Sequence, residues 1–235
     1  MRTRIAALAL LATTLSAAPA HAATQFTFVN GGGVIAFGFY VGKYNGLEGA
    51  PPGTAVTLNC VDFFHDVNNG DVWNANITSL ATGVGIGTNT RSSVLNEYKQ
   101  AAWLTTQYAA NPGQTANIQA TIWRLFPDLG TPYADVVADN APFWYNASVA
   151  ALPNFNANGF YVVTDVNHVF GPGGGVCRDV QYAAGADNPC SKQEFIIYDP
   201  TIEQVVLTAA PEPASVLLFG TGLIGLGVGV RRRKR

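Results

Sequence analysis

Residues 54–64 read TAVTLNCVDFF, and this stretch decides how the folded part of the chain is expected to be built. Side chains along a β-strand alternate between its two faces. Val56, Leu58 and Cys60 therefore share one face, while Thr57 and Asn59 point the other way. The pattern predicts a strand with one buried face, and it places the cysteine on that inward face.

The same two-residue period recurs on both sides of this stretch and predicts a mostly β domain. Asn45-Gly46 and Pro51-Pro52-Gly53 are typical of turns. The other segments expected to form strands are 25–30, 34–44, 72–80, 160–166, 193–198 and 202–208.

Between the early and the late strands the apolar period becomes helical. Ser93 to Ala110 is expected to form one helix, which Asn111-Pro112-Gly113 ends, and residues 117–126 a shorter second one. The predicted fold class is therefore α+β, mostly β: a β-sandwich or barrel-like domain with a two-helix insertion.

Both ends of the chain look like targeting segments. Residues 1–22 combine Arg2 and Arg4, an apolar run and an Ala-x-Ala ending, as in a secretory signal peptide, so the mature chain is expected to start at Ala23. The other end has Pro211-Glu212-Pro213, an apolar run over 214–230 and a basic tail to Arg235. A 17-residue apolar run is at the short end of what spans a bilayer, and the basic tail would stay in the cytoplasm.

The order and spacing of these three parts resemble the PEP-CTERM signal of Gram-negative bacteria. That resemblance implies that an exosortase is a partner and that Pro211, Glu212 and Pro213 form the sorting motif. The expected organisation is a signal peptide (1–22), an ectodomain (23–210) and a sorting signal (211–235). The protein would be held at the inner membrane by helix 214–230 and then reach the cell surface or extracellular matrix; an unprocessed C-terminal anchor is the alternative.

The predicted ectodomain is acidic. Seven of the 13 Lys and Arg residues lie in the two terminal segments, against one of the 15 Asp and Glu, which leaves a net charge of about −8. Such a surface argues against nucleic acid as a partner. No motif for a catalytic residue or a cofactor was found, so an enzyme is not expected.

An exported protein with three cysteines has one left over. Cys177 and Cys190 lie in one loop-like stretch, and in an oxidising compartment a disulfide between them is the natural interpretation. Cys60 is then the unpaired thiol.

A second segment gives this cysteine a chemical context. Residues 118–123 read IQATIW, which resembles the glutamine motif of bacterial thioester domains, and Cys60-Val61 fits their loose cysteine motif. The resemblance covers about residues 25–210, although Asn59 departs from the aromatic residue or Leu that usually precedes the cysteine. It implies an internal thioester between Cys60 and Gln119, used for adhesion or covalent attachment to an amine-bearing target.

The residues themselves agree with that chemistry. A thiolate held against a carboxamide gains a large effective concentration, and Trp123, four residues after Gln119, lies where its ring would shield the bond from water. An inert buried cysteine and a thioester-type fold without the bond are the alternatives. A non-covalent structural or binding component of the exopolysaccharide matrix is the rival function.

A metal site is a weaker hypothesis. Asp62, Asp66, Asn68 and Asp71 crowd one loop with oxygen ligands of the kind that Ca²⁺ prefers. The spacing is not that of an EF-hand, and an ordinary polar turn explains the same residues better.

Overall fold

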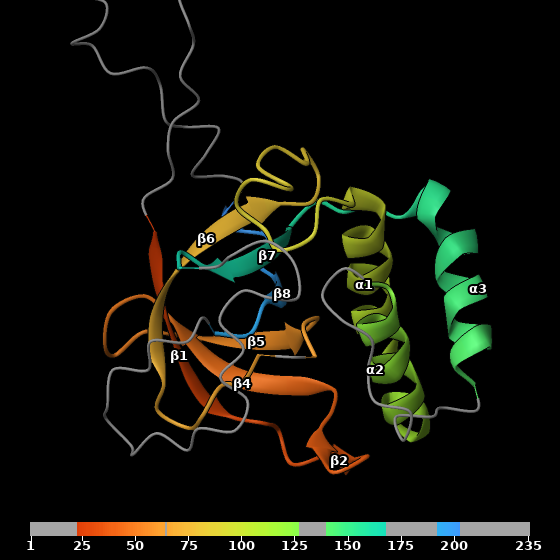
Figure 1. The fold of residues 1–235 in the computed structure, drawn as a ribbon, viewed down its shortest axis with the longest axis horizontal. Coiled ribbons are helices and arrows are strands. Elements are labelled where there is room, and N and C mark those ends of the chain that lie inside the picture. The colour runs from red at the N-terminus through yellow and green to blue at the C-terminus, as the bar shows by residue number, and fades with distance from the viewer. Residues whose placement is uncertain (1–22, 64, 127–139, 168–191, 203–235) are drawn as a thin grey trace, which may run out of the picture.

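The fold was analysed in a computed structural model, which describes residues 23–63, 65–126, 140–167 and 192–202. Six antiparallel strands close into a barrel in the order β1-β4-β5-β8-β7-β6 (Figure 1). Their bounds are Thr24–Asn30 (β1), Lys43–Glu48 (β4), Thr54–Cys60 (β5), Val72–Ser79 (β6), Phe160–Asp165 (β7) and Phe195–Tyr198 (β8). The expected mostly β class is confirmed, and of the two architectures allowed by the sequence the barrel is the one formed.

Closure is made by the pairing of β1 with β6, in the register Phe26 to Trp73. Strand β5 lies between β4 and β8, and its last residue, Cys60, pairs with Phe195. Only the last two residues of β5 pair with β8, so the barrel closes at this seam over a short contact. The short hairpin β2 (Ile35–Ala36) and β3 (Phe39–Tyr40) stands apart from the barrel as a separate two-stranded sheet.

The turn expected at Asn45-Gly46 is wrong, because both residues lie inside β4. Their partners on β5 are Thr57 and Val56. A Cβ on Gly46 would come within 2.6 Å of the Leu58 side chain, so the glycine makes room for the core rather than for a turn.

The helices lie between β6 and β7 in sequence and pack beside one end of the barrel (Figure 1). Helix α1 (Leu95–Gln107) and helix α2 (Thr115–Arg124) match the two predicted helices, with Ile118, Ile122 and Leu125 buried as expected. Helix α2 follows a short 3-10 turn, η1 (Pro112–Gln114).

The two-helix insertion is wrong by one helix, because α3 (Ala141–Ala151) follows, with a 3-10 turn η3 (Leu152–Asn154) after it. Helix α3 buries only Ala141, Trp144 and Ser148, while Phe143 and Tyr145 are exposed. The aromatic residues of α3 therefore do not form one apolar stripe. For this reason the sequence of α3 lacks the apolar spacing that predicts an amphipathic helix.

The core has two parts on either side of the barrel wall. The inner cluster fills the barrel and includes Phe26, Leu58, Cys60 and Trp73. The outer cluster lies between the barrel and the helices and includes Tyr98, Ile118 and Ile196. Helix α2 contributes to both clusters, because its Ala120 and Trp123 belong to the inner one.

Candidate functional site

Cys60 ends strand β5 with its side chain inside the barrel and completely buried. Leu58 is buried on the same face and Val56 packs against the same cluster, so the predicted inward face is confirmed. Among the described residues Cys60 is the one cysteine, and its thiol is free.

Gln119 reaches this cysteine from helix α2. Its side chain is completely buried, and its Nε2 donates to the backbone oxygen of Cys60 at 2.9 Å. The two residues are 59 positions apart in the sequence. The structure therefore brings the predicted pair together, at the end of the barrel that the helices cover.

The amide oxygen of Gln119 accepts two hydrogen bonds of its own. The Tyr108 hydroxyl donates to Oε1 at 2.8 Å, and the Gly42 backbone N–H donates at 3.2 Å. Gly42 has a φ of +88°, a conformation that glycine adopts at little cost. Two donors on one carbonyl oxygen polarise the carbonyl group and are placed where negative charge would form if a nucleophile attacked its carbon.

The thiol itself lies in a dry environment. Its Sγ donates to the backbone oxygen of Asp62 at 3.1 Å. Burial raises the pKa of the Cys60 thiol far above its usual range, and the nearby Trp123 indole opposes that rise only in part. A free thiolate is therefore disfavoured, so any reaction of this sulfur needs its proton to be transferred as the new bond forms.

Three aromatic rings pack together in the core cluster that contains Cys60. Trp123 is buried on α2, and its ring meets Phe63 edge-on with centroids 4.8 Å apart. Phe39, from the β2–β3 hairpin, contacts both rings at 5.1 Å and 6.4 Å. Trp123, Phe63 and Phe39 thus form an aromatic cluster in the same part of the core as Cys60.

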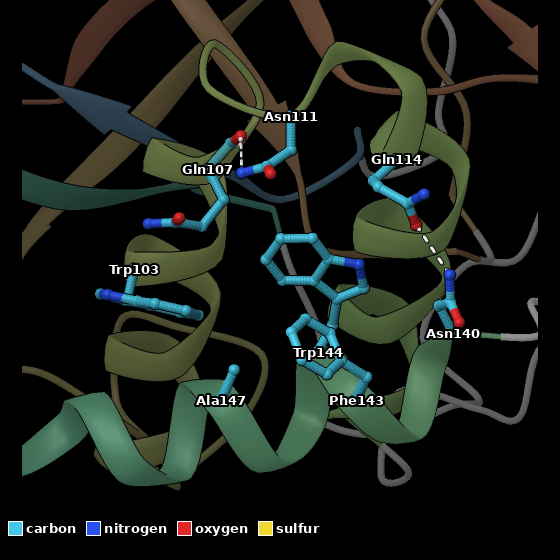
Figure 2. A pocket seen from close by; sticks show the side chains of 8 residues that line it. All are labelled: Trp103, Gln107, Asn111, Gln114, Asn140, Phe143, Trp144 and Ala147. Atoms are coloured by element: carbon cyan, nitrogen blue, oxygen red, sulfur yellow. Dashed lines mark hydrogen bonds between the residues drawn. The ribbon is translucent and has the colours of Figure 1, made fainter.

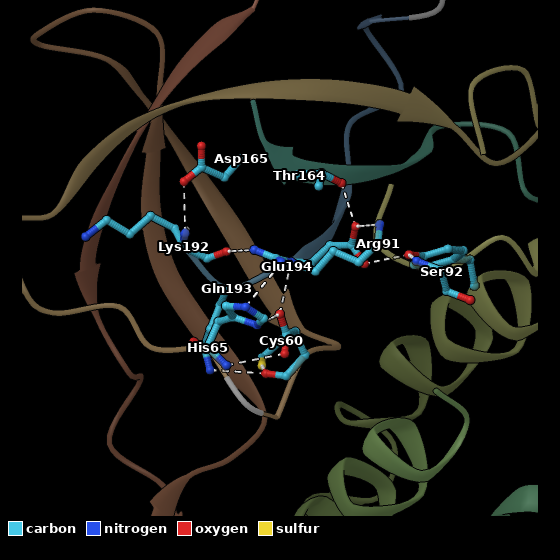
Figure 3. A network of polar contacts seen from close by, with 11 residues as sticks. Cys60, His65, Arg91, Ser92, Thr164, Asp165, Lys192, Gln193 and Glu194 are labelled. Atoms are coloured by element: carbon cyan, nitrogen blue, oxygen red, sulfur yellow. Dashed lines mark hydrogen bonds and ion pairs between the residues drawn. The ribbon is translucent and has the colours of Figure 1, made fainter. Parts of the chain in front are cut away.

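A buried polar network stands next to the cysteine (Figure 3). Arg91, only 1% exposed, places its Nε 3.1 Å from a carboxylate oxygen of Asp62, and His65 Nδ1 lies 2.6 Å from the same oxygen. Arg91 Nη1 is 3.2 Å from His65 Nε2. Because arginine has no acceptor, this Nε2 must accept, and the imidazole proton lies on Nδ1, facing Asp62.

The network continues to Glu194, which is completely buried. Its carboxylate accepts from the Arg91 backbone N–H at 2.9 Å, from Thr164 at 2.6 Å and from Tyr98 at 2.6 Å. Burial raises the pKa of Glu194, and these hydrogen bonds work against the rise. The network links Thr164 of β7 and the residue before β8 to Arg91 and to Tyr98 of α1, and through Asp62 it holds the segment that follows Cys60.

In the acidic loop, two of the carboxylates contact basic side chains, and neither contact requires a calcium ion. Asp62 pairs with Arg91 and His65, and Asp71 pairs with Lys192 Nζ at 2.7 Å. Asn68 donates its backbone N–H to Asp71. Within the described residues, no cluster of His, Cys, Asp or Glu is arranged to hold a metal ion. The weak calcium hypothesis for Asp62, Asp66, Asn68 and Asp71 therefore has no support in the described residues.

Several predictions from the sequence fall outside the described residues. These are the Cys177–Cys190 disulfide, the Pro211-Glu212-Pro213 motif, and the helix over 214–230. In the part of the chain that the structure covers, no helix combines the length and hydrophobicity needed to cross a bilayer.

Comparison with known proteins identifies the tail. Residues 209–234 match the family described as the PEP-CTERM protein-sorting motif. The chain carries the sorting signal of an exosortase substrate, which implies export and anchoring by the C-terminal tail before processing. The chain matches no curated protein and no solved structure.

Sequence reasoning missed Tyr108, Gly42, Arg91 and Glu194. In the sequence, Tyr108 is only one of the apolar positions of the predicted helix from Ser93 to Ala110, and Gly42 lies within the predicted strand 34–44. Arg91 and Glu194 are charged residues, which are rarely buried unless their charges find partners. The Arg91 guanidinium pairs with Asp62, and the Arg91 backbone N–H donates to the Glu194 carboxylate, 103 positions away in the sequence. No local pattern signals such a contact.

Proposed function

We propose that this exported, exosortase-sorted protein attaches covalently to its target through an internal thioester between Cys60 and Gln119. The observation that supports the proposal most strongly is the placement of the Gln119 amide. Its nitrogen side is held on the backbone of Cys60, and its oxygen is held by Tyr108 and Gly42, all in a buried pocket.

Formation of the bond needs no other reactant. The Cys60 sulfur attacks the side-chain carbonyl carbon of Gln119, and the charge on Oε1 is stabilised by the two donors. The thiol proton passes to the amide nitrogen, the C–N bond breaks, and ammonia leaves. The buried thiol and the aromatic cover of Trp123 and Phe63 keep water from the product.

The thioester is then an electrophile for an amine on the target. Attack by that amine forms an amide with the Gln119 carbonyl carbon and returns the proton to Cys60 as a free thiol. Each molecule reacts once, so the protein works as an adhesin of the cell surface or extracellular matrix and not as an enzyme. An acidic ectodomain agrees with an amine-bearing target, since most amines are cationic at neutral pH.

Intact mass of the full-length protein tests the proposal. We expect the measured mass to be lower, by one ammonia molecule, than the mass calculated from the sequence of the same polypeptide. Any hydrogens lost to a disulfide lower it further. Peptide mapping should locate the ammonia loss in a cross-linked pair of peptides that contain Cys60 and Gln119. A mass that retains the ammonia overturns the proposal.

Tyr108→Phe tests the two-donor arrangement. The tyrosine hydroxyl donates to Oε1 of Gln119, and the same donor would stabilise the oxyanion when an amine attacks. Loss of one such donor slows comparable reactions by about a hundredfold or more. We expect methylamine to be incorporated about a hundredfold more slowly, as followed by intact mass over time.

The matched control is Tyr198→Phe, which removes the hydroxyl of an exposed tyrosine on β8. Its rate of methylamine incorporation should equal that of the unmodified sequence. Equal rates for Tyr108→Phe and Tyr198→Phe would show that the Tyr108 hydroxyl has no part in the reaction.

A further inference from the structure

The helices form a pocket that is separate from the Cys60–Gln119 pair. It has a volume of about 560 Å³, within the range of small-molecule sites, and it lies where α1, the η1 turn and α3 meet (Figure 2). None of its lining residues belongs to the thioester site. Tyr108 turns inward to Gln119, whereas its neighbour Gln107 faces the pocket.

The lining combines aromatic rings with uncharged amides. Trp103 from α1 and Phe143 and Trp144 from α3 provide the rings, and all eight described lining residues are uncharged. Phe143 is 64% exposed, which leaves its ring free for a ligand. Exposed rings beside hydrogen-bonding groups suit a ligand that is apolar on one face and polar at its edge.

The amides retain unused hydrogen-bonding atoms. Gln114 Oε1 accepts from Asn140 Nδ2 at 3.1 Å, and Asn111 Nδ2 donates to the Gln107 backbone oxygen at 3.1 Å. Among the described residues, these bonds leave the amide nitrogen of Gln114 as a donor and the amide oxygens of Asn111 and Asn140 as acceptors. The pocket therefore offers both kinds of partner to the same ligand.

Trp144 is the buried aromatic residue of the pocket lining. It is only 5% exposed, and its indole N–H has no hydrogen-bond partner in the described part of the chain. Figure 2 shows its ring standing between the Gln107 and Asn111 side and the Gln114 side of the pocket. Trp144 therefore forms a closed wall of the pocket, and the exposed Phe143 ring and the amide groups are the parts that a ligand can reach.

We infer that this pocket binds an uncharged pyranose unit of a polysaccharide. A pyranose ring has a face of C–H groups, which stacks on aromatic rings, and a rim of hydroxyls, each both donor and acceptor. That combination matches the Trp103 and Phe143 rings and the amide atoms around them. The lack of charged lining residues excludes the salt bridges that a uronic acid or a sulfated sugar would need. This binding does not depend on the thioester.

Titration calorimetry tests the inference on the full-length chain, held in a detergent whose head group is not a sugar. The probes are linear hexasaccharides of glucose, mannose and galactose, with a galacturonate hexasaccharide as the anionic counterpart. We expect at least one neutral probe to bind with a dissociation constant of about 1 mM or tighter, and the anionic probe to bind more weakly.

The variant Phe143→Ala should weaken binding of that probe by about tenfold or more, because it removes the exposed stacking ring. Gln107→Leu should also weaken it while keeping the size of the side chain. The matched control is Tyr145→Ala, which removes another exposed aromatic ring from α3 that does not line the pocket. It should bind as the unmodified sequence does.

Three results would overturn the inference: no neutral probe binds at millimolar concentration, the anionic probe binds more tightly, or Phe143→Ala and Tyr145→Ala bind alike. Thermal melting of each variant distinguishes loss of the pocket from loss of the fold. Methylamine incorporation by the same variants should be unchanged, so failure here and failure of the thioester can be told apart.

Discussion

We expect Gln119→Glu and Cys60→Ala each to abolish methylamine incorporation, whereas the unmodified full-length protein should gain one methylamine. In the proposed thioester the electrophile is the Gln119 carbonyl carbon, which would be activated by its bond to the Cys60 sulfur. A glutamate at 119 is not attacked by the thiol, and an alanine at 60 provides no nucleophile. Intact mass before and after treatment measures the gain, and peptide mapping should place it on Gln119.

The control substitution is Gln100→Glu, which makes the same chemical change on helix α1 at a residue that is only partly buried. It should incorporate methylamine like the unmodified protein. A labelling reagent for thiols adds a second readout, because Cys60 should become detectable after methylamine treatment and unfolding but not before treatment. Incorporation that persists in Gln119→Glu would place the electrophile elsewhere.

Arg91→Met should lower the free energy of unfolding by about 3–5 kcal/mol, the cost typical of removing one partner of a buried ion pair. The fully buried Asp62 carboxylate would lose its cationic partner, and the Lys192 backbone oxygen would lose the 2.7 Å hydrogen bond from Nη2. Urea unfolding of the full-length chain, followed by tryptophan fluorescence, measures the change.

Arg124→Met is the matched control, because Arg124 is exposed at the end of α2. Its effect should stay below about 1 kcal/mol, as for other exposed charges. Adding Asp62→Asn to Arg91→Met should recover part of the loss, since the buried carboxylate is then removed together with its cation. Equal destabilisation by Arg91→Met and Arg124→Met would contradict the role given to the network.

Much of the local structure follows from the order of residues along the chain. The alternation in 54–60 predicts β5 and its buried face, and the helical spacing of Ile118, Ile122 and Leu125 predicts α2 and its buried side. Local rules failed where a contact from elsewhere overrides them. Asn45-Gly46 has the composition of a turn, yet both residues lie in β4. A glycine occurs at position 46 because a larger side chain would collide with Leu58 on the neighbouring strand.

The candidate site was only half visible in the sequence. Cys60, Gln119 and Trp123 stood out by residue type and spacing. Tyr108 and Gly42 did not, because their role is to donate to an oxygen that the barrel and the helices bring to them. The same holds for the pocket, whose amides and aromatic rings come from three separate segments.

The sequence by itself determined the sorting tail, the strand that buries Cys60, and the helix that carries Gln119. Each of these features depends on the pattern of residues that are close to one another in the sequence. The tertiary structure alone decided that the barrel closes, that Gln119 lies against Cys60, and that Arg91 is paired inside the core. Those contacts join residues many positions apart. They form only when burial of the whole core offsets the entropy of ordering the chain between them.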